Sequence, residues 1–343
     1  MSSGSQKILV IGGAGYIGAH MVRHLLRSGY AVVILDNLST GSRRLVQGGD
    51  LVIGSLGDRD LLEGLFSAHV FDAVMHFAAF SQVGESVQQP LKYYRNNLAE
   101  TMVLLEVMLR YAVKRFIFSS TAAVYGEPQA IPIVEGHPCR PTNPYGNTKL
   151  AVERMLADCD AAYGLKYTAL RYFNAAGADE SAEIGELHDP ETHLIPLVLR
   201  AAAGRIEHIQ VYGTDYPTRD GTCIRDYVHV SDLARAHLLA LERLMAGGES
   251  AVYNLGSSSG YSVNEVIAQA EKVTGKPIPV KAAARRAGDP AVLIAGSAKI
   301  KQELGWQPVY EELEPILRTA WRWHGKEKGG RAGAKDPRGP GVE

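Results

Sequence analysis

The first half of the chain alternates short apolar runs with segments whose apolar residues recur at helical spacing. Residues 7–11 (KILVI) and 31–35 (AVVIL) have the pattern of buried strands, because both runs are short and rich in β-branched residues. Residues 16–28 between them have helical spacing, and Gly29 is suited to end that helix. Strand, helix and strand in this order predict two parallel strands joined by a crossover helix.

The alternation continues to about residue 175. Further strands are predicted at 51–53, 72–77, 115–119 and 167–171, and further helices at 59–68, 90–111 and 145–163. The pattern therefore predicts an α/β fold, with a Rossmann-type doubly wound parallel sheet in a nucleotide-binding domain at 1–175.

Turn-forming residues become frequent after residue 174, and helical spacing returns at 232–245 and 262–274. We expect a smaller mixed α/β substrate-binding domain at 176–324, some of whose segments return to the large sheet. The last 19 residues, 325–343, contain many glycines and almost no large apolar residue. They are expected to form a disordered tail.

Composition excludes several classes of protein. The 343 residues carry a net charge of −1, which argues against a nucleic-acid binder or a polybasic membrane binder. Three widely spaced cysteines form neither a disulfide framework nor a zinc motif. No apolar run reaches the length of a transmembrane helix, and the polar start MSSGSQK does not resemble a signal peptide. A cytoplasmic protein is expected.

A glycine-rich turn separates the first predicted strand from its helix. Gly12, Gly15 and Gly18 would let the backbone approach a pyrophosphate, which the free N–H groups of the helix start would bind. Asp36 ends the next predicted strand, where its carboxylate suits a ribose diol and repels a 2′-phosphate. The turn therefore predicts a dinucleotide site that favours NAD over NADP.

Tyr145 and Lys149 are four residues apart on a predicted helix, so they share one face. A free tyrosine has a pKa of ~10, which a nearby ammonium group and an oxidised nicotinamide would lower. Tyr145 is then able to take a proton from a substrate hydroxyl as a hydride leaves. Thr121 follows a predicted strand and would hydrogen-bond the same hydroxyl at the carboxyl edge of the sheet.

Several motifs together resemble the extended short-chain dehydrogenase/reductase superfamily: G-G-A-G-Y-I-G (12–18), F-S-S-T-A-A-V-Y-G (118–126), P-Y-G-N-T-K (144–149) and R-Y-F-N (171–174). The segment 212–237 narrows the resemblance to the UDP-glucose 4-epimerases, also called UDP-galactose 4-epimerases. The resemblance covers about residues 7–322. It implies that tightly held NAD oxidises the sugar at C4, that the 4-keto sugar rotates, and that the hydride returns to its opposite face. It also implies a homodimer, with a helix bundle between the subunits.

The resemblance assigns roles to individual residues. Tyr145 is the acid/base, Lys149 orients the nicotinamide ribose, and Thr121 assists at O4. Cofactor contacts are implied, besides the glycines and Asp36, for Tyr16, Ile17, Asn37, Phe77, Ala78, Ala79, Asn97 and Phe173. Substrate contacts are implied for Asn174, His193, Leu194, Gln210, Val211, Tyr212, Arg225, Arg286 and Asp289. Asn174 and the two arginines would hold the diphosphate, Asp289 the uridine ribose, and residues 210–212 the uracil.

Some positions depart from the family pattern. Ser55 stands where many members have an acid near the adenine, and Asp58 would replace it only if the loop shifts. Leu293 stands where some members have a bulky tyrosine beside the sugar, so UDP-N-acetyl sugars are also possible substrates.

The alternatives are other nucleotide-sugar enzymes of the same fold and a non-catalytic NAD-binding protein. UDP-pentose and UDP-uronate 4-epimerases share the chemistry at C4 and stay open. A 4,6-dehydratase would need an acid pair where Ala122 and Ala123 stand, and a non-catalytic NAD-binding protein would have no need of an intact Tyr145 and Lys149.

The segment H-D-P-E-T-H (188–193) gathers several possible metal ligands. Its spacing matches no helical zinc motif, and Pro190 breaks a helix there. We therefore expect a polar loop with one residue facing the substrate, and no metal.

Overall fold

The computed structural model describes residues 5–286 and 289–330. Within them a seven-stranded parallel sheet has the order β11-β6-β5-β4-β1-β2-β3. Its strands are β1 (Lys7–Ile11), β2 (Ala31–Asp36), β3 (Asp50–Ile53), β4 (Ala73–His76), β5 (Arg115–Thr121), β6 (Lys166–Tyr172) and β11 (Ala251–Leu255). The predicted doubly wound sheet is therefore confirmed.

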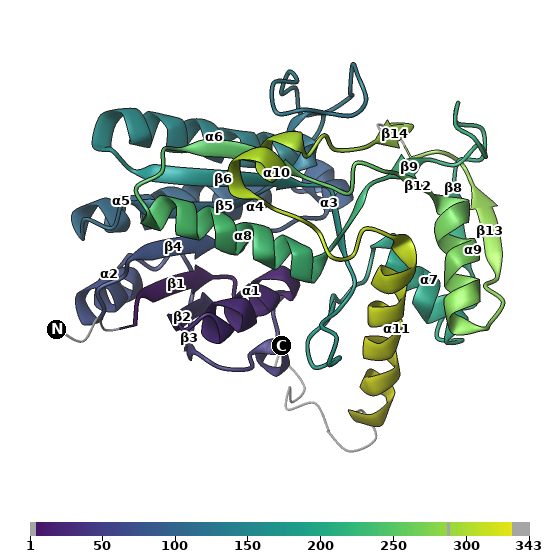
Figure 1. Cartoon of the computed structure of the whole chain (residues 1–343), viewed down its shortest axis with the longest axis horizontal. Coiled ribbons are helices and arrows are strands. Elements are labelled where there is room, and N and C mark those ends of the chain that lie inside the picture. Colours follow the sequence, from purple (N-terminus) through teal and green to yellow (C-terminus); the bar gives the residue numbers. More distant parts are fainter. Residues whose placement is uncertain (1–4, 287–288, 331–343) are drawn as a thin grey trace.

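Helices cover both faces of this sheet (Figure 1). Ile8 and Val10 point to one face and pack with α1 (Tyr16–Arg27) and α8 (Val230–Met245). Leu9 points to the other face, whose helices are α2 (Arg59–Ala68), α5 (Glu100–Arg110) and α6 (Pro144–Tyr163). Burial on both faces explains why the strands are continuous apolar runs.

The winding of the chain reverses at β1. This strand pairs with β2 on one side and with β4 on the other. Ligands of open α/β sheets bind beyond the carboxyl ends of the strands at such a reversal. The glycine-rich turn leaves β1 at this point.

A smaller lobe lies beside the carboxyl ends of β5 and β6, at the right of Figure 1. Its core is formed mainly by α7 (Leu194–Ala202), α9 (Val263–Thr274) and α11 (Leu313–Gly330). Its short strands are β7 (Asn174–Ala176), β8 (Ile209–Tyr212), β9 (Ile224–Arg225), β10 (Tyr227–His229), β12 (Tyr261–Ser262), β13 (Val280–Ala283) and β14 (Val292–Leu293). β7 pairs with β10, β8 with β13, and β9 with both β12 and β14.

The chain passes between the two parts more than once. β11 joins the large sheet beside β6. α8 and α10 (Ala298–Leu304) contribute to the apolar core on the same face of that sheet as α1. The remaining short helices are η1 (Arg43–Leu45), α3 (Val83–Gln88), α4 (Pro90–Tyr93), η2 (Tyr94–Ala99) and η3 (Ala122–Val124).

Two details differ from the sequence-based expectation. The predicted helix at 90–111 is α4 and α5 joined through the π-helical η2. α11 extends to Gly330, so residues 325–330 of the predicted tail are helical, whereas 331–343 lie outside the described residues. Adding residues to a formed helix costs little, and α11 is anchored by buried residues such as Leu317 and Trp323. In the described part of the chain, no helix is both long and apolar enough to span a membrane.

Candidate active site

The turn after β1 is held between α1 and the segment that follows β4. Gly12 has a φ of +76°, and a Cβ there would lie 2.5 Å from the backbone nitrogen of Ala78. A Cβ on Gly18 would lie 2.1 Å from the carbonyl oxygen of Gly12. Glycine is therefore required at both positions, and Gly15 stands at the N-terminus of α1, where backbone N–H groups are free to bind an anion.

Asp36 lies at the carboxyl end of β2, beside this turn. Its Oδ2 accepts a hydrogen bond from the Ala14 N–H (2.9 Å), and its Oδ1 accepts one from Leu38 N–H (2.8 Å). Burial raises its pKa, and the two backbone hydrogen bonds oppose that effect. These bonds fix the carboxylate in the lining of a cleft beside the turn. Predicted residues that line this cleft are Gly12, Gly15, Asp36, Asn37, Phe77, Ala78 and Ala79.

Glu100 also lines the cleft, although no motif in the sequence predicts it as a site residue. It is the first residue of α5, and its Oε2 accepts a hydrogen bond from Ser55 Oγ (3.0 Å). A carboxylate is therefore present where Ser55 departs from the family pattern. Asp58 does not supply it, because its Oδ1 caps α2 through the Leu61 N–H.

Three other predicted cofactor contacts have different surroundings. The buried Tyr16 donates a hydrogen bond from its hydroxyl to the carbonyl oxygen of Gly177 (2.6 Å), while Ile17 is half-buried in the first turn of α1. Asn97 is buried, and its amide bonds the backbone N–H and C=O of Phe80, both at 3.0 Å. Asn97 thus positions the segment that lines the cleft.

The predicted catalytic residues meet at the carboxyl end of β5. Asn143 caps α6 by accepting a hydrogen bond from Gly146 N–H (2.9 Å), which starts the helix beside the strand. Tyr145 then forms a hydrogen bond with Thr121, the last residue of β5. Four residues on, Lys149 donates from Nζ to the Ser119 carbonyl (2.9 Å). Both helix residues therefore contact one strand end, as their spacing predicts.

Burial shifts the pKa values of this pair in opposite directions. It lowers the pKa of Lys149 to about 7, although the negative charge of Glu153 acts to raise it. It raises the pKa of Tyr145, against the hydrogen bond with Thr121. A positive charge brought next to Tyr145 would favour the phenolate and draw its pKa back down.

β6 carries the chain from the catalytic strand to the smaller lobe. Its last residue, Tyr172, is in register with Thr121. Phe173 packs against the buried cluster that contains Val124, and Leu293 packs against the same cluster. Asn174 donates from its amide to the Asp226 carbonyl oxygen (2.8 Å).

Predicted diphosphate and uridine contacts gather in two pairs in the smaller lobe. Arg225 forms an ion pair with Asp289, and the Arg286 guanidinium stacks 3.9 Å above the ring centre of Tyr212. β8 carries Gln210 exposed and Val211 buried, so the side chain of Val211 contributes to the core, and only its backbone can reach a ligand.

Leu194 begins α7, and His193 is its N-cap. His193 Nδ1 lies 2.8 Å from Glu186 Oε1 and 3.0 Å from Glu191 Oε1. Burial would lower the pKa of His193, but contact with the two carboxylates outweighs it and raises the pKa to about 10.

Comparison with known families matches residues 8–256 to the NAD dependent epimerase/dehydratase family. The chain belongs to this family. It is 54% identical over 317 residues to the UDP-glucose 4-epimerase of Halalkalibacterium halodurans, covering 92% of this chain and 95% of that protein.

Solved structures of family members agree. The UDP-glucose 4-epimerase of Brucella ovis in complex with NAD superposes with a TM-score of 0.91 at 51% identity, covering 93% of this chain and 98% of that one. The enzyme of Bifidobacterium longum in complex with NAD⁺ and UDP gives a TM-score of 0.90 at 41% identity, covering 95% and 100%.

Proposed function

We propose that the protein interconverts UDP-galactose and UDP-glucose by epimerisation at C4, with NAD as a tightly held cofactor. The observation that carries the proposal is the meeting of Tyr145, Lys149 and Thr121 at the end of β5. The UDP-glucose 4-epimerases among the family members support the choice of substrate.

The residues at the cleft fit NAD. The start of α1 offers backbone N–H groups to a pyrophosphate, Asp36 offers a carboxylate to a ribose diol, and Glu100 adds an acceptor. When bound, the nicotinamide supplies hydride acceptance and return at C4 of the sugar.

The protein's own groups manage the proton and the position of the sugar. Tyr145 takes the proton from the C4 hydroxyl and gives it back, while the Thr121 hydroxyl orients the same oxygen. The ammonium group of Lys149 stabilises the Tyr145 phenolate. Arg225 and Arg286 suit the diphosphate, because a planar guanidinium pairs with two phosphate oxygens at once.

The test adds UDP-galactose to purified protein, without and then with added NAD, and measures UDP-glucose by anion-exchange chromatography. Tyr145→Phe is expected to lower kcat by about 10²–10⁴-fold while bound NAD is retained. Tyr163→Phe, at the exposed end of the same helix, is the matched control and should keep full activity. Full activity of Tyr145→Phe would contradict the proposal.

A second substrate class, the UDP-N-acetylhexosamines, is supported by Leu293. This residue packs against the same cluster as Phe173, next to the end of β5. A leucine leaves more room there than a tyrosine does. Leu293→Tyr is expected to suppress turnover of UDP-N-acetylglucosamine and to spare UDP-glucose. If the wild-type protein uses only UDP-glucose, this second proposal fails.

A homodimer and a cytoplasmic location complete the proposal. Large apolar side chains are exposed along α3, α4, η2 and α5, with Val87 62% and Leu91 81% accessible. A face of this kind suits a second copy of the chain. The cysteines Cys139, Cys159 and Cys223 are free thiols, as expected in a reducing compartment. Light scattering should give twice the mass of one chain, and Leu91→Lys should reduce it to one.

A further inference from the structure

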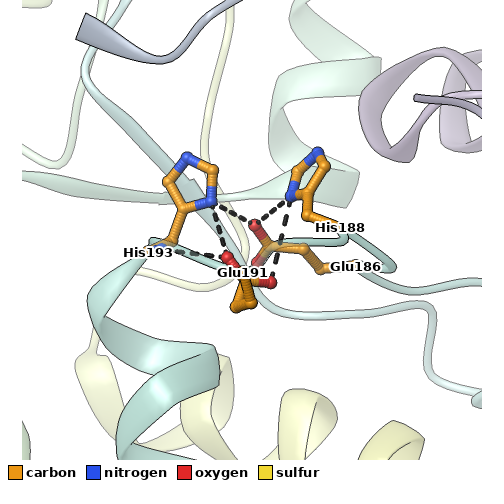
Figure 2. A group of neighbouring side chains, drawn as sticks. All are labelled: Glu186, His188, Glu191 and His193. Atoms are coloured by element: carbon orange, nitrogen blue, oxygen red, sulfur yellow. Dashed lines mark hydrogen bonds and ion pairs between the residues drawn. The ribbon is translucent and has the colours of Figure 1, made fainter. Parts of the chain in front are cut away.

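Four side chains between β7 and α7 converge on one point, where sequence analysis predicts an ordinary polar loop. They are Glu186, His188, Glu191 and His193, and Figure 2 shows their polar atoms turned toward one another. One possible ligand atom from each lies within 4.8 Å of all the others. The convergence is a property of the fold, because the spacing alone matches no zinc motif.

The contacts within this cluster exceed what single hydrogen bonds can satisfy. Glu186 Oε1 lies 2.8 Å from His193 Nδ1 and 3.0 Å from His188 Nδ1. Glu191 places Oε1 3.0 Å from His193 Nδ1 and Oε2 3.9 Å from His188 Nδ1. One imidazole Nδ1 carries at most one hydrogen, so His193 cannot donate fully to both carboxylates. A cation between the four side chains would contact both at once.

The charge of the cluster also calls for a cation. The Glu186 and Glu191 side chains are only 7% and 1% exposed, and burying two adjacent carboxylates is costly without compensation. Protons on the two histidines supply one form of compensation. One divalent cation with two neutral imidazoles supplies the same charge and replaces the shared hydrogen bonds with direct bonds.

The backbone around the cluster holds the side chains in place. Trp323 Nε1 donates to the Glu186 carbonyl oxygen (2.9 Å). The N–H groups of Thr192 and His193 donate to Glu191 Oε1 at 2.8 and 2.9 Å, which leaves Oε2 available. Such outer contacts orient ligands in protein metal sites.

We propose that Glu186, His188, Glu191 and His193 bind one divalent transition-metal cation of the zinc class. Two imidazole nitrogens and two carboxylate oxygens suit zinc better than magnesium or calcium, which prefer oxygen ligands alone. With metal–ligand bonds of about 2.0–2.2 Å, neighbouring ligand atoms of a tetrahedron lie roughly 3.4 Å apart. The nitrogen–oxygen separations of 2.8, 3.0, 3.0 and 3.9 Å, the last two to different oxygens of Glu191, lie within about 0.6 Å of that value. Four protein ligands close the coordination shell, which indicates a structural site.

The position of the site indicates what the ion would stabilise. His188 lies beside Tyr16, with ring centres 6.3 Å apart, and Tyr16 in turn bonds Gly177. His193 occupies the N-cap position of α7, a helix of the smaller lobe. The ion would therefore fasten the segment 177–193 to the start of α1 and to the start of α7. This role does not depend on which sugar the protein uses.

The test uses the full, untagged protein, freed of metal by chelation and then loaded with Zn²⁺ or Co²⁺. Zinc content after desalting should reach one ion per chain, and Co²⁺ should give the strong visible absorption of four-coordinate cobalt. Zn²⁺ should displace the cobalt signal and raise the unfolding temperature by about 4 °C when its free concentration is 100 times Kd.

Two ligand variants and one control locate the site. Glu186→Gln and His188→Gln should each weaken zinc binding by more than the ~10–100-fold that outer contacts cost, and should abolish the cobalt spectrum. His208→Gln removes a histidine beside Glu207, outside the cluster, and should bind zinc like the wild type. Zinc content near zero in the wild type, or unchanged binding in both ligand variants, would overturn the proposal. If the variants do not fold, weak six-coordinate cobalt absorption in the wild type would overturn it as well.

Discussion

Arg171 and Glu153 form a buried ion pair directly behind the catalytic strand. The guanidinium binds the carboxylate through Nε (3.0 and 3.2 Å) and Nη2, and Ser120 donates to the same carboxylate at 2.5 Å. The side chains are 7% and 5% exposed. Removing the charge of Glu153 would leave Arg171 buried without its counterion, and such losses cost about 3–5 kcal/mol.

Glu153→Gln is therefore expected to lower the free energy of unfolding by about 3 kcal/mol, measured by urea denaturation. Glu106→Gln breaks an ion pair with Arg59 in which both side chains are about half exposed, and it should cost under ~1 kcal/mol. Equal effects of the two substitutions would contradict this account of the buried pair.

The role of a residue could be predicted from the sequence where that role depends only on spacing along one helix or strand. Tyr145 and Lys149 needed only a helix to share a face. Glu100 could not be found in this way, because it reaches the cleft through packing between α5 and the loop that holds Ser55. The convergence of Glu186 and His193 escaped for the same reason, since it depends on how an irregular loop folds back on itself.

At the scale of elements, close packing of α1 on the glycine turn sets a strict limit on side-chain size. Gly18→Ala would place its Cβ 2.1 Å from a backbone oxygen, which no rotamer change relieves. We expect loss of bound NAD and destabilisation of at least ~1–3 kcal/mol. The measurement is the NAD content of the purified protein together with its unfolding temperature.

Gly64→Ala is the matched control in α2. A Cβ there meets nothing within 4 Å, so the substitution should stabilise the protein by up to about 1 kcal/mol and leave NAD content unchanged. Loss of NAD in both variants would indicate a general sensitivity of the helices to alanine.

Most elements of the large sheet could be predicted from their apolar runs and helical spacing. β11 was missed because the polar Asn254 interrupts its short apolar run, AVYNL. α7 and α11 were missed as well, since their amphipathic faces pack on each other and on α9, which is visible only in three dimensions.

At the scale of the whole molecule, buried histidines make stability depend on pH. Burial lowers the pKa of His20 and His237 to about 4 and of His76 and His229 to about 3. Unfolding exposes these rings, which then bind protons below pH ~6.5. The stability that they provide is complete above that pH and is lost as the pH falls toward 4.

Urea denaturation at pH 7.5, 6.0 and 5.0 should therefore show a steady fall in the free energy of unfolding. At pH 5.0 each histidine should contribute a loss of about 2 kcal/mol, from ~1.36 kcal/mol per pKa unit. Asp226, whose pKa burial raises to about 6, acts in the opposite sense, and so do Asp36, Asp232 and His193, whose pKa values are also raised. The net fall should therefore be smaller than the sum over the four histidines. Constant stability between pH 7.5 and 5.0 would refute the prediction.

The late position of β11 in the chain has a consequence for synthesis on the ribosome. β6 ends at Tyr172, but the strand that pairs with its free edge ends at Leu255, about 80 residues later. At ~5–20 residues per second, the nascent chain carries that open edge for roughly 4–16 s. During this interval its unpaired N–H and C=O groups can recruit a strand from a neighbouring nascent chain. The yield of folded protein should therefore depend on how fast the ribosome translates residues 173–255.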